Sequence, residues 1–354
     1  MNYPANKICN SILSSLLMSQ SMAKQLHLAR SLYLIIFTLS WGLFGCNNLG
    51  SSSGFVSVTT TNNNTKNNFP QVVATTTILC DLVDKIASGT INLSCLIPPN
   101  TDPYTYQVNN NDRQALYQAK LIFYNGYNLE PQLIKAIINT PNRSPKVAVA
   151  KFAVKKPLYY RNQGRRIPNP HIWHNVKHAT RMVAVINSFL GQRFPQNKNI
   201  YQENANALKS ELFQLHKWVK TRINTIPKEQ RELITAHDSM GYYAKAYGFN
   251  LSGSVHSINT TKKPTPARSQ ALVQGIKKAK VLTIFPEFTV ETESIRNVAK
   301  QAGVKIANQK LYTHALSEPG TKADTYRKMI TTNTRSIVEG LGGTYFIFTP
   351  KQKP

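Results

Sequence analysis

Continuous apolar segments alternate with stretches of helical spacing along this chain, and no other feature constrains its fold as strongly. Residues 78–87 and 111–118 have the spacing of amphipathic helices. The segments around them are apolar throughout, which is typical of strands that are buried on both faces. These expected strands are residues 71–77, 92–97, 121–126 and 146–150. The pattern predicts a parallel sheet that is covered by helices on both sides.

The same alternation returns in the second half, after a long helical stretch at residues 178–224 that is interrupted near Pro195. The later strands are expected at residues 233–237, 281–285, 304–307 and 345–348, and the later helices at residues 242–247, 294–302 and 326–341. We therefore predict an α/β fold of two similar lobes, each a mainly parallel sheet flanked by helices, joined by a long helix.

The expected lobes span residues 71–177 and 226–354, and residues 178–225 link them. In open α/β sheets, ligands bind beyond the carboxyl ends of the strands. Two facing lobes therefore predict a binding site in the cleft between them.

Residues 1–45 predict an export signal. Lys24 and Arg30 precede an apolar run at residues 31–43, which is too short to cross a membrane as a helix. The signal has an ordinary length if the true start of the protein is Met22.

The segment Leu43-Phe44-Gly45-Cys46 is similar to a bacterial lipobox, in which the cysteine carries the lipid. An ordinary signal peptide and an uncleaved anchor are the alternatives. Residues 46–70 are small and polar, which predicts a flexible tether. We expect an exported protein on the periplasmic or extracellular face, anchored to the membrane by lipid at Cys46.

The chain carries 43 Lys and Arg against 16 Asp and Glu, and this net charge of +27 usually indicates an acidic partner. No acidic residue occurs between residues 131 and 202, and residues 155–166 interleave bases with aromatic side chains. Such a pattern is found on surfaces that bind nucleic acid, but export argues against that partner. We therefore expect a solvated face that meets an anionic membrane surface or an acidic protein.

Four cysteines are too few for a disulfide-built scaffold, and the lack of a Cys-x-x-Cys pair argues against a zinc ribbon. Cys80 and Cys95 lie in neighbouring expected elements of an exported protein. We expect either a disulfide between them or two buried free thiols. The disulfide would stabilise the fold by about 3 kcal/mol in the chain-entropy model.

Three histidines drawn from both halves lie in turns or at the ends of expected strands. His171 lies in a turn, His237 ends an apolar strand, and His314 follows a short strand. Imidazole is a common zinc ligand, and three imidazoles suit Zn²⁺. His174 stands three residues after His171, a helical spacing that can direct two imidazoles at one metal.

Motifs around these histidines occur in order from about residue 71 to 349. They are Val72–Leu79, Leu96–Tyr106, Leu121–Pro131, Asn169-Pro-His-Ile-Trp173, Thr235-Ala-His-Asp-Ser-Met-Gly-Tyr-Tyr243, Ala315–Gly320 and Ala323–Tyr326. Together they resemble the zinc- and manganese-binding proteins of bacterial ABC importers. The resemblance implies two lobes joined by a rigid backbone helix, a lipid-anchored or periplasmic location, and delivery of one divalent ion to a membrane permease.

That family draws four metal ligands from four loops, and the resemblance places them at Tyr104, His171, His237 and His314. Relatives usually carry His at the first position, His or Glu at the third and Asp at the fourth. This chain therefore has three imidazoles and no carboxylate at the four positions. Tyr104 could bind the metal as phenolate, point away and leave water in its place, or block the site.

Manganese sites favour carboxylate oxygens, so the three imidazoles predict Zn²⁺ over Mn²⁺ or another divalent transition metal. Asp102 and Glu287 are candidate carboxylates that support the ligands or replace one of them. For Glu287, a loop position in solvent is the alternative.

We predict a monomeric extracytoplasmic solute-binding protein, not an enzyme, that captures the ion and delivers it to an ABC importer permease. One alternative is a lipid-anchored adhesin or envelope-binding module on the same fold, with a degenerate metal site. Another is a zinc hydrolase, because three histidines and an open fourth position suit catalytic zinc. No motif places a general base, which argues against the hydrolase.

Overall fold

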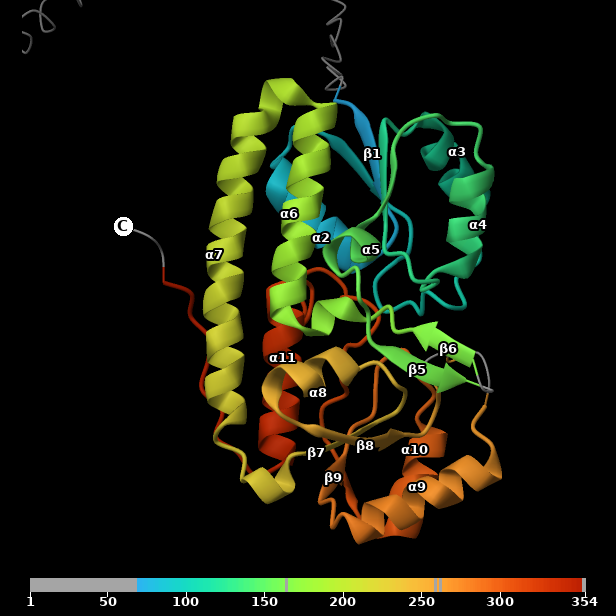
Figure 1. The fold of residues 1–354 in the computed structure, drawn as a ribbon, viewed down its shortest axis with the longest axis vertical. Coiled ribbons are helices and arrows are strands. Elements are labelled where there is room, and N and C mark those ends of the chain that lie inside the picture. Colours follow the sequence, from blue (N-terminus) through green and yellow to red (C-terminus); the bar gives the residue numbers. More distant parts are fainter. Residues whose placement is uncertain (1–68, 163–164, 258–259, 261–262, 352–354) are drawn as a thin grey trace, which may run out of the picture. The chain divides into compact units, whose positions relative to one another are not determined.

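The computed structural model describes residues 69–162, 165–257, 260 and 263–351 (Figure 1). The expected signal, Cys46 and nearly all of the expected tether lie outside these residues. Residues 65–354 form one compact unit, and every element described below belongs to it. In the part of the chain that the structure describes, no helix is long and apolar enough to cross a membrane.

The first lobe contains a parallel sheet of four strands in the order β2–β1–β3–β4. Each strand lies within an apolar run that predicted it and ends slightly earlier, because the chain turns there into the next element. The strands are β1 (Gln71–Ala74), β2 (Asn92–Cys95), β3 (Leu121–Tyr124) and β4 (Lys146–Ala148).

Helices cover both faces of this sheet, as the apolar strands predict. Alternate strand residues point to opposite faces, so Val72 and Phe123 pack with α2, whereas Val73 and Ile122 pack with α3 and α4. The helices of this lobe are α2 (Thr77–Ala87), α3 (Asn110–Gln118), α4 (Pro131–Asn139) and the short α5 (Val149–Ala153).

A disulfide joins Cys80 in the first turn of α2 to Cys95 at the end of β2. It therefore ties a helix to the edge strand of the same sheet. Cys80 is buried, whereas Cys95 is exposed.

Two long helices, α6 (Val176–Arg193) and α7 (Lys198–Ile223), lie side by side, and α7 runs along both lobes (Figure 1). The chain turns between them at η2 (Pro195–Asn197), where the sequence predicts an interruption. One stripe of α7 is buried, with three- and four-residue spacing. Its members are Tyr201, Ala205, Leu208, Leu212, Leu215, Val219 and Ile223. The predicted long linking helix is confirmed.

The second lobe is also built on parallel strands, but its sheet is less regular. One pair is β7 (Glu232–Thr235) with β8 (Asn250–Ser254), and the other is β9 (Thr283–Ile284) with β10 (Lys305–Ile306). A single bridge between Thr235 and Phe285 joins the two pairs. The helices of this lobe are α8 (Gly241–Tyr247), α9 (Pro266–Lys278), α10 (Glu293–Ala302) and α11 (Tyr326–Gly340).

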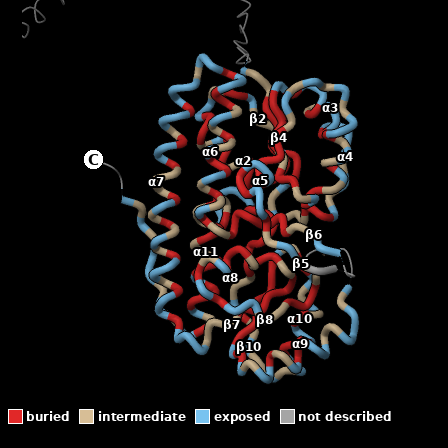
Figure 2. Tube along the Cα trace, in the orientation of Figure 1, coloured by how far each residue is buried: buried red, intermediate tan, exposed pale blue. Residues whose placement is uncertain are grey.

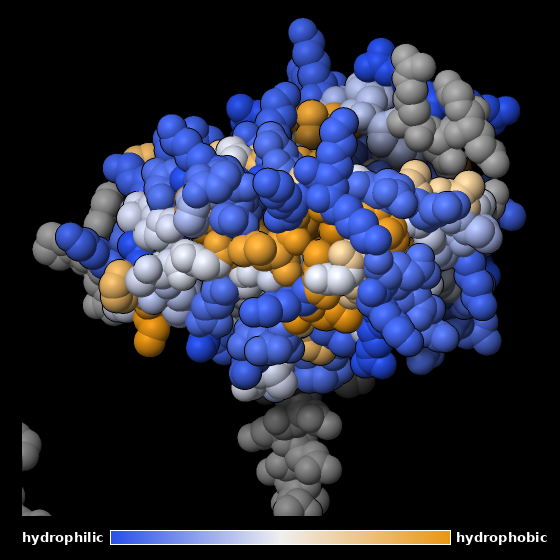
Figure 3. Space-filling model, turned by 90° about the horizontal axis from the view of Figure 1, so that it is seen from below, coloured by the Kyte–Doolittle hydropathy of each residue, from blue (hydrophilic) through white to orange (hydrophobic). Residues whose placement is uncertain are grey.

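Burial separates the covered sides of these elements from the exposed ones. Figure 2 shows buried residues through both lobes and along the inner sides of α6, α7 and α11. Figure 3 views the end of the second lobe, which is hydrophilic around a smaller apolar area. The lobes are therefore held together by a core that continues along the long helices.

One predicted strand is wrong, and several elements were not predicted. Residues 345–348 form no strand; they lie along α7, where the Trp218 indole N–H donates to the Phe346 carbonyl at 3.2 Å and the Trp218 ring contacts Tyr345. Tyr345 and Phe348 thus pack against a helix, whereas Phe346 and Ile347 are exposed. The helices α4 and α9 were not predicted either; each buries two or three side chains.

An antiparallel hairpin of β5 (Tyr159–Asn162) and β6 (Arg165–Pro168) was also not predicted, since neither strand is apolar. It follows α5 and precedes the His171 turn. In Figure 1 it lies between the main parts of the two lobes.

Candidate metal centre

Three imidazoles from separate segments converge in the protein interior. His171 follows β6, His237 follows β7, and His314 lies between β10 and α11. One ligand atom from each lies within 4.8 Å of the others, and the Nε2 atoms of His171 and His237 are 3.5 Å apart. No more than 1% of any of the three residues is exposed. This metal cluster, as we call it, has the size and the donor set of a site for one metal ion.

The Nδ1 atom of each histidine faces a protein oxygen, and this leaves Nε2 for a metal. Nδ1 of His171 lies 2.9 Å from the Asn169 amide oxygen, Nδ1 of His237 lies 2.5 Å from a Glu287 carboxylate oxygen, and Nδ1 of His314 lies 2.9 Å from the Thr289 hydroxyl. Nε2 of His314 is buried and has no hydrogen-bond partner among the described residues. Such outer contacts fix the orientation of metal-binding imidazoles.

Asn169 positions His171 through both its backbone and its ring. The His171 backbone N–H donates to the Asn169 side-chain oxygen at 3.0 Å, an Asx-type turn that Pro170 helps to fix. The Asn169 amide in turn donates to the Asp238 carbonyl at 3.2 Å. His171 is therefore tied to the residue that follows His237.

Glu287 is fully buried and holds the His237 segment. It accepts the His237 backbone N–H at 3.0 Å and the Thr313 hydroxyl at 2.6 Å. Burial alone would raise the pKa of Glu287, but His237 and these hydrogen bonds hold it below its usual value. The solvent position that remained an alternative for this residue is thus wrong, and Glu287 lies behind His237.

Tyr104 packs beside the cluster from the first lobe. Its ring centroid is 6.1 Å from that of His171 and 5.6 Å from that of His314, and 7% of the residue is exposed. Burial, together with the negative potential of neighbours that include Asp102 and Glu130, raises the pKa of Tyr104 well above its usual value. A neutral phenol is a poor metal ligand, so the environment opposes a phenolate bond.

Asp102 approaches the cluster from the same loop as Tyr104. One oxygen accepts the Tyr104 backbone N–H at 2.9 Å and lies 3.6 Å from Nδ1 of His314. The other accepts the hydroxyl of Thr260 in the second lobe. Asp102 thus connects the first lobe to His314 and is the nearest carboxylate on that side.

Burial favours the neutral form of two histidines of the cluster, His171 and His314. Burial, then the neighbouring His237, lowers the pKa of His171 well below its usual value and that of His314 to about 4. Metal binding requires the neutral imidazole, so little proton release opposes binding near pH 7.

His174 is buried but lies outside the metal cluster. Its Nε2 lies 3.0 Å from the Thr313 carbonyl oxygen, and its ring stacks near that of His171 at 6.4 Å. The spacing from His171 therefore gives a packing contact. Sequence analysis missed Asn169, Thr289 and Thr313 as supporting residues; only Asn169 stood in a quoted motif, and no signal marked the two threonines.

Comparison with known proteins gives consistent results. The family model described as "Zinc-uptake complex component A periplasmic" matches residues 72–340. The chain is 30% identical to the metal ABC transporter substrate-binding lipoprotein SloC of Streptococcus mutans over 316 residues, which cover 88% of this chain and 98% of SloC. It is also 30% identical over 315 residues to the manganese ABC transporter substrate-binding lipoprotein ScaA of Streptococcus gordonii, covering 87% and 98%.

Among solved structures, the periplasmic zinc-binding protein TroA from Treponema pallidum matches with a TM-score of 0.72 and 28% identity, covering 77% of this chain and 99% of TroA. TroA thus shares the fold of this chain, and the names of these relatives include both zinc and manganese.

Proposed function

This chain belongs to the zinc-uptake complex component A family, the substrate-binding proteins of bacterial metal ABC importers, and we propose that its cargo is Zn²⁺. Such a protein binds a metal ion for transport and is not an enzyme. The ion would be held by His171, His237 and His314 and passed to the permease of the importer.

The donor set of the cluster supports zinc. Three buried imidazoles converge, and none of the cluster's three ligands is a carboxylate. Zinc accepts nitrogen ligands readily, whereas manganese favours oxygen. The names of relatives do not decide between these metals, so the proposal rests on the ligands of this chain.

The supporting contacts suit capture of an ion by the folded protein. Asn169, Glu287 and Thr289 hold the three imidazoles in place before the ion arrives. Tyr104 and Asp102 close the cluster from the first lobe, and Asp102 reaches Thr260 of the second. Separation of the lobes would remove this closure, which offers a route for release to the permease.

We further propose that the protein is exported, anchored by lipid at Cys46, and monomeric. The lipoprotein names of SloC and ScaA support the anchor. Mass spectrometry of the mature protein tests it: the first residue should be a lipidated Cys46, and a mature start elsewhere would contradict the anchor.

One competition experiment tests the cargo. The metal-free protein is titrated with Zn²⁺ and with Mn²⁺ against a chromophoric chelator at pH 7. We expect Zn²⁺ to bind at least about a hundredfold more tightly, in line with the preference of nitrogen donors. Equal or tighter binding of Mn²⁺ would reject zinc as the cargo. Elemental analysis of protein purified from its own cell envelope then identifies the metal carried in the cell.

A further inference from the structure

The hairpin of β5 and β6 carries a group of basic side chains beside the metal cluster. Lys155 and Lys156 precede β5, and Arg165 and Arg166 lie on β6. All four are exposed. The Arg166 guanidinium lies over the ring of Tyr159, 4.5 Å from its centroid, and Tyr159 is 50% exposed. We call these five residues the basic hairpin surface.

No carboxylate neutralises this surface. Across the described parts of the chain, none of its four bases forms an ion pair. The sequence gives a reason, since no Asp or Glu occurs between residues 131 and 202. The charges are therefore available to a partner, and exposed Arg and Tyr are the side chains that contribute most energy at protein interfaces.

The base of the hairpin is bonded directly to the residues that hold the metal cluster. The Asn169 backbone N–H donates to the Leu158 carbonyl at 2.7 Å, which closes the hairpin. The Leu158 N–H donates to the Tyr242 hydroxyl at 2.8 Å, and this hydroxyl donates to the Asn169 carbonyl at 3.0 Å. Asn169 orients His171, so a partner on the hairpin would sit next to the metal.

Two carboxylates beside the cluster are more exposed than its histidines. The three histidines are at most 1% exposed, but the side chain of Asp102 is 10% exposed and that of Asp238 is 26% exposed. Asp238 follows His237 and is bonded through its carbonyl to Asn169.

Positive charge at this place does not help to capture the ion. A basic rim raises the local potential and repels a free divalent cation, which slows its approach. Guanidinium groups instead form bidentate hydrogen bonds with carboxylates. The chemistry of the surface thus fits an acidic partner that meets the protein when the metal is handed over.

We propose that the basic hairpin surface docks onto an acidic extracytoplasmic surface of the importer's permease and sets the metal cluster against its entrance. This inference rests on the proposed function, because it assumes a permease as the receiver. An anionic lipid surface would satisfy the same charges, but it would not require the charges to adjoin the metal. The position of the hairpin favours the permease.

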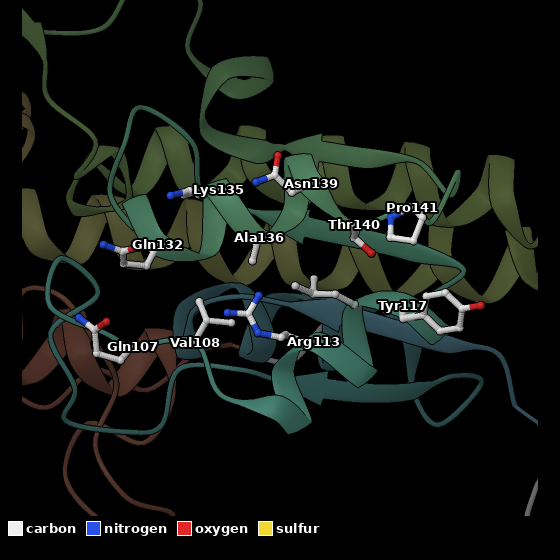
Figure 4. A pocket seen from close by; sticks show the side chains of 11 residues that line it. Gln107, Val108, Arg113, Tyr117, Gln132, Lys135, Ala136, Asn139, Thr140 and Pro141 are labelled. Carbon is white, nitrogen blue, oxygen red and sulfur yellow. The ribbon is translucent and has the colours of Figure 1, made fainter.

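A second cation-lined surface on the first lobe supplies the matched control. A groove of about 460 Å³ runs between α3 and α4 and is lined by Arg113 and Lys135 (Figure 4). Both side chains are exposed, and neither forms an ion pair among the described residues. No residue of the hairpin lines this groove. Reversing two charges there changes the net charge of the protein as much as it does on the hairpin.

The test compares the mature chain with two double variants, Arg165→Glu with Arg166→Glu and Arg113→Glu with Lys135→Glu. Binding to the purified permease is measured in nanodiscs of zwitterionic lipid, at low and high salt. Zinc affinity is measured by chelator competition, and folding by thermal unfolding. We expect the hairpin variant to bind the permease at least tenfold more weakly, with unchanged zinc affinity and melting temperature. The control variant should bind within about twofold of the unaltered protein, because unpaired surface charges away from an interface contribute little.

Each other outcome overturns the docking proposal. Equal binding by the hairpin variant, or an equal loss in both variants, would show that this surface is not the docking site. If the hairpin variant loses binding to vesicles of anionic lipid but binds the permease normally, the surface is assigned to the membrane. Failure of the proposed function would give a different result: the unaltered protein would not bind zinc. In that case, permease binding by the metal-free protein and its hairpin variant would still test whether the hairpin is the docking site.

Discussion

Each lobe buries one glutamate completely at the carboxyl end of its sheet, but the two glutamates have different partners. In the second lobe, Glu287 faces Nδ1 of His237 at 2.5 Å, and its pKa is held below the usual value despite burial. In the first lobe, Glu130 accepts the Asn125 backbone N–H at 2.6 Å and the Thr75 hydroxyl at 2.9 Å. Burial raises the pKa of Glu130 to about 7, against these hydrogen bonds.

The difference shows that one kind of buried group serves two purposes here. Glu287 orients His237 and brings negative charge to the metal cluster. Glu130 joins the ends of β1 and β3. It is linked to the His171 segment through Asn125, whose amide donates to the Pro170 carbonyl at 3.3 Å, and its charge acts on Tyr104. The first lobe thus uses its carboxylate for architecture and the second lobe uses it for the site.

The largest effect should come from removing one of the candidate metal ligands, either His237 beside Glu287 or His171. We expect His237→Ala and His171→Ala each to weaken zinc binding by more than the 10–100-fold that supporting residues typically contribute. Chelator competition measures this loss. His216→Ala, on α7 and outside the cluster, should leave the affinity unchanged. Near-normal affinity in either ligand variant would show that the ion is held elsewhere.

Glu130 should make the fold less stable as the pH rises. Its pKa is 4.5 in its ordinary state and about 7 in the fold, so between these values the folded protein keeps a proton that the unfolded chain releases. This stabilisation is fully present below pH 4.5 and is lost above pH 7. At 1.36 kcal/mol per pKa unit, the free energy of unfolding falls by about 3 kcal/mol over this range. Urea unfolding of the metal-free protein at pH 5 and pH 8 measures most of this change.

The variant Glu130→Gln should lose this part of the pH dependence, because the amide keeps the shape and carries no charge. Glu229→Gln, at an exposed position, should retain it. If Glu130→Gln and the unaltered protein lose the same free energy of unfolding between pH 5 and pH 8, the carboxylate of Glu130 is ionised in the fold throughout, as Glu287 is.

The comparison is sharpened by making the same substitution in both lobes. Glu287→Gln should weaken zinc binding about 10–100-fold, the range for residues that orient a metal-binding imidazole. Glu130→Gln should change it by less than about threefold, since two hydrogen bonds separate it from the His171 segment. Both affinities are measured at pH 7 by chelator competition. Equal losses would mean that the first lobe also tunes the metal, and the division of roles would be abandoned.

Much of the architecture could be predicted because buried parallel strands leave a plain pattern. The four strands of the first lobe and the break at Pro195 follow from continuous apolar runs and a proline. In the second lobe, β9 and β10 lie within the predicted strands at residues 281–285 and 304–307, but β8 was missed. β8 is half exposed, so it lacks the continuous apolar run of a buried strand.

The three histidines of the metal cluster could also be predicted from the sequence, but the electrostatics of the cluster could not. His171, His237 and His314 stand at turns and strand ends, and family motifs surround them. The low pKa values of His171 and His314 depend on burial and on neighbouring histidines, which requires the packed structure. The hairpin was missed because Arg165 and Arg166 are charged, and its strands are formed by backbone pairing with no apolar face.

The smallest effect should come from Tyr104, a side chain of the first lobe that packs beside the cluster. Burial raises the pKa of its phenol, and three imidazoles already converge on one point, so ionising it to form a metal bond would cost more than it gains. Tyr104→Phe keeps the ring and removes the oxygen, and it should change zinc affinity by less than about threefold. Tyr104→His offers a fourth imidazole and should tighten binding. A clear loss in Tyr104→Phe, or a zinc-bound crystal structure with the Tyr104 oxygen within about 2.2 Å of the metal, would show that the first lobe contributes a ligand through this residue.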